Sequence, residues 1–195
     1  MLYLNQLDYP DIPYVHRTEQ PDGPVVSSVR KSGCGLCCSC MMVEHLTMHT
    51  LPIADCVEMA EDNQANKGAG SSQAVLGPVL AEKFGLEFSQ SYEIEDALQC
   101  LCEGGEVIIN VGGDHDDHIG IYSHGGHYVL AIGYDGEELC ILDPSYKEDK
   151  YEEEGRQGKV KVDYPFTYCT PDVIVSDTRN RNPCFSMYKR KKYHE

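Results

Sequence analysis

Apolar residues recur with a helical period through the first half of the chain. Counting from Cys34, soft or apolar side chains return at positions 37, 38, 41 and 42, which is the spacing of a single helix face. Comparable patterns, with glycine as a stop or acidic residues in the first turn, predict three more helices. The predicted helices span residues 34–47, 53–64, 73–84 and 93–102. Residues 1–31 hold four prolines and no sustained period, so we expect extended, loop-like chain there.

In the second half the pattern changes to short runs of branched apolar residues, which are typical of strands. These runs predict strands at residues 106–111, 127–132, 138–142, 159–162 and 172–175. The pair Asp135-Gly136 predicts a tight hairpin between the second and third of them. Helices followed by antiparallel strands indicate an α+β fold with two segregated layers. We expect one domain over residues 1–195, with a helical lobe at about 30–104 and a sheet lobe at about 105–188.

The charge balance limits the classes of binding partner that are expected. The chain carries 32 acidic and 16 basic residues, for a formal net charge of −16. Nucleic acid and anionic membrane surfaces attract the opposite charge, so neither is expected as a partner. The basic run at residues 189–192 is predicted to be a solvated tail, and the charged stretch at 147–159 an exposed loop. No run approaches the roughly 20 apolar residues of a transmembrane helix, and the first residues lack a signal-peptide pattern. The oligomeric state is left open.

Four of the ten cysteines fall within residues 34–40, and such close neighbours on one helix cannot all bridge one another. We therefore expect reduced thiols in a reducing compartment, with the cytoplasm favoured. Cys34 stands at the predicted helix start between Gly33 and Gly35, where the helix dipole and unpaired backbone N–H groups favour a nucleophilic thiolate. A buried structural cysteine would show the same local pattern.

His127 begins one predicted strand and Asp143 ends the next. If residue 134 pairs with 138 across the hairpin, residue 127 lies opposite 145, and Asp143 is its diagonal neighbour, roughly 7–8 Å away between Cα atoms. A carboxylate there can orient an imidazole, and such a pair serves a thiol nucleophile as general base. Each residue is also common in structural roles, since Asp-Pro opens many turns.

Four motifs occur in a recognisable order. Gln6 opens the run Gln-Leu-Asp-Tyr-Pro, Cys34 lies in Ser-Gly-Cys-Gly, His127 lies in Gly-His-Tyr, and Asp143 lies in Asp-Pro-Ser. In order and spacing they resemble the bacteriocin-leader-peptidase-like cysteine peptidases, family thirty-nine of the papain-like clan. The resemblance covers residues 5 to about 145, roughly three-quarters of the chain. Leu36 departs from it, because family members often have proline at that position.

The resemblance implies a papain-like fold and hydrolysis of a peptide or amide bond through an acyl-enzyme. It makes Cys34 the nucleophile, His127 the base, Asp143 the orienting acid and Gln6 the side-chain donor of an oxyanion hole, with a peptide or protein substrate and no cofactor. Leader peptidases of the family sit on membrane transporters; this chain has no transporter segment, so a bacteriocin leader as substrate is an analogy. Acyl transfer or deamidation by the same triad, and a non-catalytic peptide-binding module on the same scaffold, are the alternatives.

Other signals were weighed against this interpretation. Cys37 would be the nucleophile if residues 34–38 followed the papain-type C-G-[SA]-C-[WY] signature, but Lys31 stands six residues before it instead of a glutamine. The Cys34-x-x-Cys37 spacing also suits a redox pair, yet no βαβ pattern precedes it, and no second such pair completes a metal site. The run Asp-His-Asp-Asp-His at residues 114–118, with His124 nearby, has metal-ligand composition but is expected to be an exposed acidic loop. His45 is expected to be a core histidine.

Overall fold

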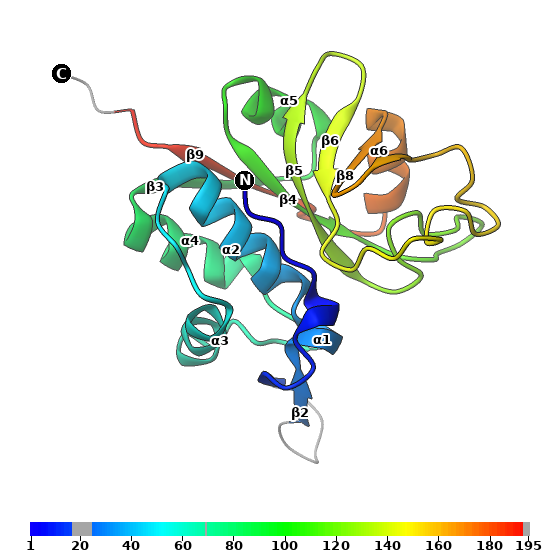
Figure 1. The fold of residues 1–195 in the computed structure, drawn as a ribbon. Coiled ribbons are helices and arrows are strands. Elements are labelled where there is room, and N and C mark those ends of the chain that lie inside the picture. Colours follow the sequence, from blue (N-terminus) through cyan, green and yellow to red (C-terminus); the bar gives the residue numbers. More distant parts are fainter. Residues whose placement is uncertain (17–24, 69, 193–195) are drawn as a thin grey trace.

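A computed structural model describes residues 1–16, 25–68 and 70–192. Within them the chain is a mixed α/β fold with six helices and a large antiparallel sheet (Figure 1). The helical elements are η1 (Gln6–Asp8), α1 (Val29–Ser32), α2 (Cys34–Thr47), α3 (Ile53–Asp62), α4 (Gln73–Phe84), α5 (Ile94–Cys102) and α6 (Pro171–Thr178). The strands are β1 (Pro13–His16), β2 (Val25–Ser28), β3 (Leu86–Ser91), β4 (Glu106–Val111), β5 (His127–Tyr134), β6 (Leu139–Leu142), β7 (Lys161–Asp163), β8 (Phe166–Cys169) and β9 (Phe185–Arg190).

The seven-stranded sheet has the order β3-β9-β4-β5-β6-β8-β7, and every neighbouring pair is antiparallel. Two hydrophobic clusters cover its two faces, one built around α2 and α4 and the other around α5 and α6. The central strand β4 contributes to both, because Ile108 joins the α2 cluster while Val107 and Ile109 join the other. Burial on both faces explains why β4 is a continuous apolar run rather than an alternating one.

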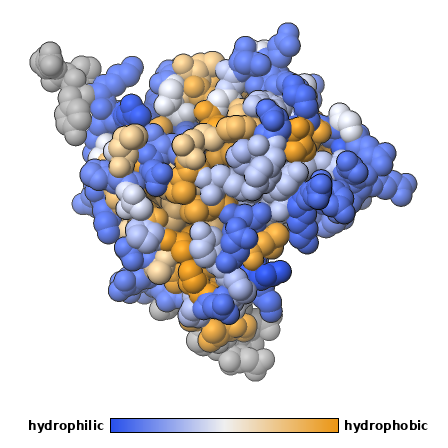
Figure 2. Space-filling view, in the orientation of Figure 1, coloured by the Kyte–Doolittle hydropathy of each residue, from blue (hydrophilic) through white to orange (hydrophobic). Residues whose placement is uncertain are grey.

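Helix α2 is the centre of the first cluster. Its residues from Gly35 to Val43 are all buried, as is Leu46, so the helix is enclosed on every side rather than along a single stripe. The N-terminal segment covers it on one side, where the Leu4 N–H lies 3.3 Å from the Met41 sulfur. In Figure 2 apolar side chains gather in the middle of the face where Figure 1 shows this segment and α2, and hydrophilic side chains dominate the rim.

The helices predicted at 34–47 and 73–84 and the strand predicted at 106–111 have the observed bounds, and the other helices and strands before residue 164 are displaced at their ends. The strand predicted at 172–175 is wrong, because these residues lie in α6. Pro171 occupies the first turn of that helix, and Thr170 precedes it as the N-cap residue. A proline in the first turn is preorganised for a helix, and this local signal outweighs the branched run of Val173, Ile174 and Val175.

Three strands of the large sheet, β3, β8 and β9, were not predicted, and two of them mix the expected layers. Strand β3 lies inside the range expected for the helical lobe and pairs with the C-terminal strand β9, which also pairs with β4. Helix α6 lies inside the range expected for the sheet lobe. Helices and strands are therefore less segregated along the chain than predicted. The prediction of a solvated tail at 189–192 is wrong for Lys189 and Arg190, which belong to β9, where Arg190 Nε donates to Leu46 O at 2.6 Å.

Residues 1–31 are extended in part, as predicted, but they also form short regular elements. This segment contains η1, the antiparallel pair β1–β2 and α1; residues 17–24 lie outside the described part of the chain. Because these elements are only three or four residues long, they have no periodic signal of their own. They bring the N-terminal segment to both α2 and the end of β6: the Gln6 N–H donates to Pro144 O at 2.7 Å.

Candidate active site

Cys34 is the first residue of α2, directly after the Gly33 cap. The turn is tight at Gly33, where any Cβ would lie 2.4 Å from Val29 Cγ1 and 2.6 Å from its carbonyl oxygen. Cys34 is partly exposed, whereas Cys37 is fully buried. As the first helical residue, Cys34 also has a backbone N–H without a partner inside the helix. The partial exposure of the residue therefore favours Cys34 over Cys37 as the nucleophile.

The thiol of Cys34 interacts with the imidazole of His127. Burial acts to raise the pKa of Cys34, but the hydrogen bond and the charge of His127, helped by the backbone N–H groups of Tyr128 and Gly35, bring it below its ordinary value. For His127, burial acts to lower the pKa, but Asp143 and Cys34 together raise it above its ordinary value. The two shifts have the same consequence, because each favours a thiolate beside an imidazolium.

The other buried thiols behave differently. Burial raises the pKa of Cys37 and Cys38 well above the ordinary value, with added repulsion from Cys34. It also raises the pKa of Cys100 to about 11 and that of Cys169 to about 12. All ten cysteines are free thiols. The environment of Cys34 therefore favours its ionised form, while burial keeps these four neutral.

His127 and Asp143 come from neighbouring strands, as predicted, but the hairpin register differs from the prediction. Tyr134 pairs with Leu139 instead of residue 138, and a bulge between Ala131 and Gly133 then shifts the register so that Leu130 pairs with Leu142. The bulge cancels the one-residue offset, so the pairing returns to the predicted register. In that register Asp143 is the diagonal neighbour of His127. His127 Nε2 lies 2.8 Å from Asp143 Oδ1, which leaves Nδ1 as the ring nitrogen that faces the thiol.

Asp143 is fully buried, and its two oxygens have separate partners. Oδ1 accepts from His127 and from the Ser145 N–H at 2.9 Å. Oδ2 accepts from Lys150 Nζ and from the Tyr151 hydroxyl, each at 2.6 Å. Burial alone would raise the pKa of Asp143, but the Lys150 charge, followed by the contact with His127, holds it well below its usual range. The carboxylate is therefore ionised wherever the protein is folded near neutral pH.

Sequence reasoning missed Lys150, Tyr151 and Ser145. The exposed charged loop predicted at 147–159 is wrong at its centre, because Lys150 and Tyr151 are buried against Asp143. Arg156 is also buried and donates to the Lys150 carbonyl at 3.1 Å, which holds this loop in place. Within the run of charged residues from 147 to 154, a buried lysine has no distinguishing pattern; Tyr151, the aromatic residue among them, was the available signal.

Gln6 is buried between the end of β6 and α1. Its backbone N–H donates to Pro144 O, and its Nε2 donates to Arg30 O at 2.8 Å. Its Oε1 is buried without a hydrogen-bond partner, so the side-chain amide has unused capacity. The amide nitrogen carries a second hydrogen. Gln6 thus joins the segment that leads to Cys34 with the segment that follows Asp143.

The histidines of the acidic loop have separate partners, and His115 Nδ1 lies 2.8 Å from Gly113 O. His118 Nε2 lies 2.8 Å from the buried Asp177 Oδ1, and the exposed His124 lies between Asp114 and Glu153. In the described residues no group of three His, Cys, Asp or Glu side chains is arranged to hold a metal ion. His45 is a core histidine: Nδ1 lies 2.9 Å from Glu106 Oε1 and Nε2 lies 2.8 Å from Leu2 O.

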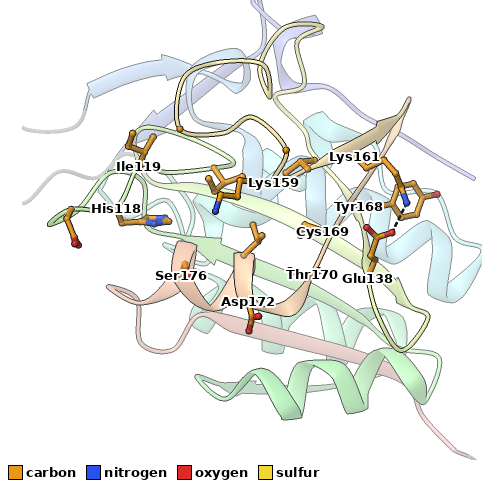
Figure 3. Close-up of a pocket in the computed structure, with 16 residues that line it drawn as sticks. His118, Ile119, Glu138, Lys159, Lys161, Tyr168, Cys169, Thr170, Asp172 and Ser176 are labelled. Atoms are coloured by element: carbon orange, nitrogen blue, oxygen red, sulfur yellow. Dashed lines mark hydrogen bonds and ion pairs between the residues drawn. The ribbon is translucent and has the colours of Figure 1, made fainter.

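A cavity of about 640 Å³ has His118 in its lining (Figure 3). It is bounded by α6, by β8 and by the loop that carries Gly155 to Lys161, and Cys34, His127 and Asp143 do not line it. Its charged groups largely offset one another; Lys161 pairs with Glu138 at 2.7 Å across its edge, as Figure 3 shows. The described helices include none with the length and apolar character needed to cross a bilayer.

No protein-family model matches the chain, and no curated protein matches it. Among solved structures it is similar to the crystal structure of a "putative C39-like peptidase" from Bacillus anthracis. The TM-score is 0.59 at 15% sequence identity, and the alignment covers 98% of this chain and 96% of that chain. At this identity the similarity establishes a shared fold. The resemblance drawn from the sequence motifs is therefore confirmed at the level of the fold.

Proposed function

We propose that the protein is a cysteine peptidase of papain-like architecture that cleaves a peptide bond through Cys34, His127 and Asp143. The single observation that carries the proposal is the continuous chain of contacts from the Cys34 thiol to His127 and on to the buried Asp143. The three side chains come from a helix start and two strands far apart in sequence, and their order of contact is the one that thiol catalysis needs. The fold shared with the "putative C39-like peptidase" supports the same conclusion.

In this mechanism His127 Nδ1 takes the proton of Cys34, and the thiolate attacks the carbonyl carbon of the scissile bond. The developing oxyanion accepts hydrogen bonds from the Cys34 N–H and from the second Nε2 hydrogen of Gln6. His127 then protonates the leaving amine as the C–N bond breaks, which leaves a thioester on Cys34. Water, deprotonated by His127, hydrolyses the thioester and regenerates the thiol. Asp143 stays ionised and holds the imidazole in one orientation.

A fluorogenic peptide library tests the proposed activity. We expect wild-type protein to hydrolyse a subset of peptides, and Cys34→Ala to hydrolyse none above background. Cys37→Ala is the matched control, because it removes a thiol from the same helix at a buried position, and it is expected to keep turnover. Hydrolysis that persists in Cys34→Ala would contradict the assignment. Amines added to the assay would divert the thioester and reveal acyl transfer instead.

Alkylation by iodoacetamide is expected to single out Cys34 without any substrate. Because its pKa is lowered while burial raises that of its neighbours, we expect Cys34 to react at pH 7 at least about tenfold faster than an ordinary thiol of pKa about 8.5. His127→Ala removes the group that lowers this pKa, so the midpoint of the rate against pH should move upward. Mass spectrometry of labelled peptides gives the rates. Ten equally slow thiols would favour the peptide-binding module without catalysis.

A further inference from the structure

The turn after α6 places an arginine beside the catalytic histidine. Val111 at the end of β4 pairs with His127, and Asn180 lies against the next residue, where its Nδ2 donates to Gly112 O at 3.3 Å. Arg181 follows, and its Nη2 would lie 2.7 Å from a Cβ built on Gly126. A guanidinium group therefore lies over residue 126, directly before His127.

Arg181 and Tyr128 both lie close to the start of β5. Residues 126 and 128 share one face of an extended chain, and the Tyr128 ring lies on that face, 3.2 Å from a Cβ built on Gly35. Burial raises the pKa of the Tyr128 phenol, repulsion from Cys34 raises it further, and the charge of Arg181 opposes both. The charges of both the thiol and the guanidinium act on the phenol, so Tyr128 lies between the influence of Arg181 and that of Cys34.

Within residues 1–16, 25–68 and 70–192, the charge of Arg181 has no ion-pair partner. In the described part of the chain no carboxylate forms an ion pair with it, although the sequence has 32 acidic residues. Its Nε is buried without a hydrogen-bond partner, while its backbone N–H donates to Thr178 O at 2.9 Å. A buried, unpaired donor costs free energy. Among the anions common in peptides, the carboxylate is the best match for a guanidinium with unused donors. Both groups are planar and can form two parallel hydrogen bonds.

We infer that Arg181 is a specificity-determining residue that binds a carboxylate of the substrate next to the scissile bond, so that the preferred substrates are acidic peptides. The inference rests on the proposed function, because it places substrate in the groove beside Cys34. Bound substrate supplies the negative charge that the chain does not provide. The carboxylate comes either from an Asp or Glu side chain or from the substrate's free C-terminus, and both present the same group to Arg181.

Two alkylating reagents test the site without requiring turnover. Iodoacetate and iodoacetamide both place a carbon on the Cys34 sulfur and release iodide, but only the first carries a carboxylate. At low ionic strength, Arg181→Gln is expected to lower the iodoacetate-to-iodoacetamide rate ratio at Cys34 at least about fivefold. Arg181→Lys keeps the charge and should retain most of the ratio. Arg179→Gln, which removes an exposed arginine two residues away, is the matched control and should leave the ratio unchanged.

Peptide pairs then identify the source of the carboxylate. Amidated peptides with Glu or Gln at each position near the cleavage site measure side-chain recognition, and free-acid or amidated ends measure terminal recognition. We expect wild type to prefer the charged member of one pair by about tenfold in kcat/KM, and Arg181→Glu to prefer Lys at that position. An unchanged alkylation ratio in Arg181→Gln, or an equal fall in Arg179→Gln, would overturn the inference about Arg181. Peptide turnover by the wild type would still support the proposed peptidase activity. A changed ratio without turnover of any peptide would instead refute the peptidase and leave the anion site.

Discussion

Replacing Asp143 with alanine is expected to lower kcat/KM by about 10³-fold or more and the free energy of unfolding by about 3–5 kcal/mol. Activity falls because His127 Nε2 loses the acceptor 2.8 Å away that fixes its orientation. Stability falls for a different reason. The ammonium of Lys150 is buried 2.6 Å from Asp143 Oδ2, and without the carboxylate it would be a buried charge with no counter-charge. Peptide hydrolysis and urea unfolding measure the two losses separately.

A second substitution separates the two effects. Lys150→Met removes the orphaned charge, so the double variant Asp143→Ala, Lys150→Met should recover part of the lost stability but none of the activity. Asp143→Asn keeps an oxygen acceptor for His127 Nε2 and should lose less activity than Asp143→Ala. If Asp143→Ala unfolded at the same urea concentration as wild type, or if the double variant were no more stable than the single one, the paired burial of Asp143 and Lys150 would be contradicted.

The elements that sequence reasoning located are those whose burial leaves a strong pattern. Helix α2 and strand β4 are enclosed by the rest of the chain, so most of their positions are apolar or small. Gly33 precedes α2, and Gly104 and Gly105 precede β4. Such segments are predictable because tertiary packing and local preference agree. In α6 they disagree, since Val173, Ile174 and Val175 favour a strand while Pro171 favours a helix start.

The residues of the site likewise divide into those that the sequence pattern marks and those that it does not. Cys34, His127 and Asp143 each lie at an element boundary that the pattern marks, and hairpin pairing relates the last two even though a bulge moves the register. The hydrogen-bond partners of Asp143 Oδ2 follow no such rule, because Lys150 and Tyr151 lie in an irregular loop, and their burial depends on contacts such as that of Arg156 with the Lys150 carbonyl. Arg181 was missed for the same reason: its position beside His127 is set by how the turn after α6 meets the end of β4.

Lys150→Met is expected to move the alkaline limb of the pH profile of kcat/KM upward by about one unit. In the proposed mechanism the active pair is the thiolate of Cys34 with the imidazolium of His127, and activity on the alkaline side ends when His127 loses its proton. The positive charge of Lys150 opposes protonation of His127 in two ways. It shares the negative charge of Asp143 at 2.6 Å, and it reaches His127 through Ser145, whose Oγ lies 2.8 Å from Lys150 Nζ and 3.0 Å from His127 Nε2. Without the ammonium, the pKa of His127, already above its ordinary value, rises further.

The same change should cost about 1–3 kcal/mol of unfolding free energy, because Asp143 keeps its contacts with His127, Ser145 and Tyr151 but loses its strongest one. Lys147→Met is the matched control: Lys147 is exposed, lies three residues earlier and carries the same charge, so neither the limb nor the stability should change. The measurement is kcat/KM against pH at constant ionic strength, with iodoacetamide alkylation of Cys34 over the same range. A limb that stays in place while stability falls would make Lys150 a purely structural residue. An upward shift in both profiles would show that the buried Lys150 ammonium sets the proton affinity of His127. A substitution that acted through stability alone would move neither profile.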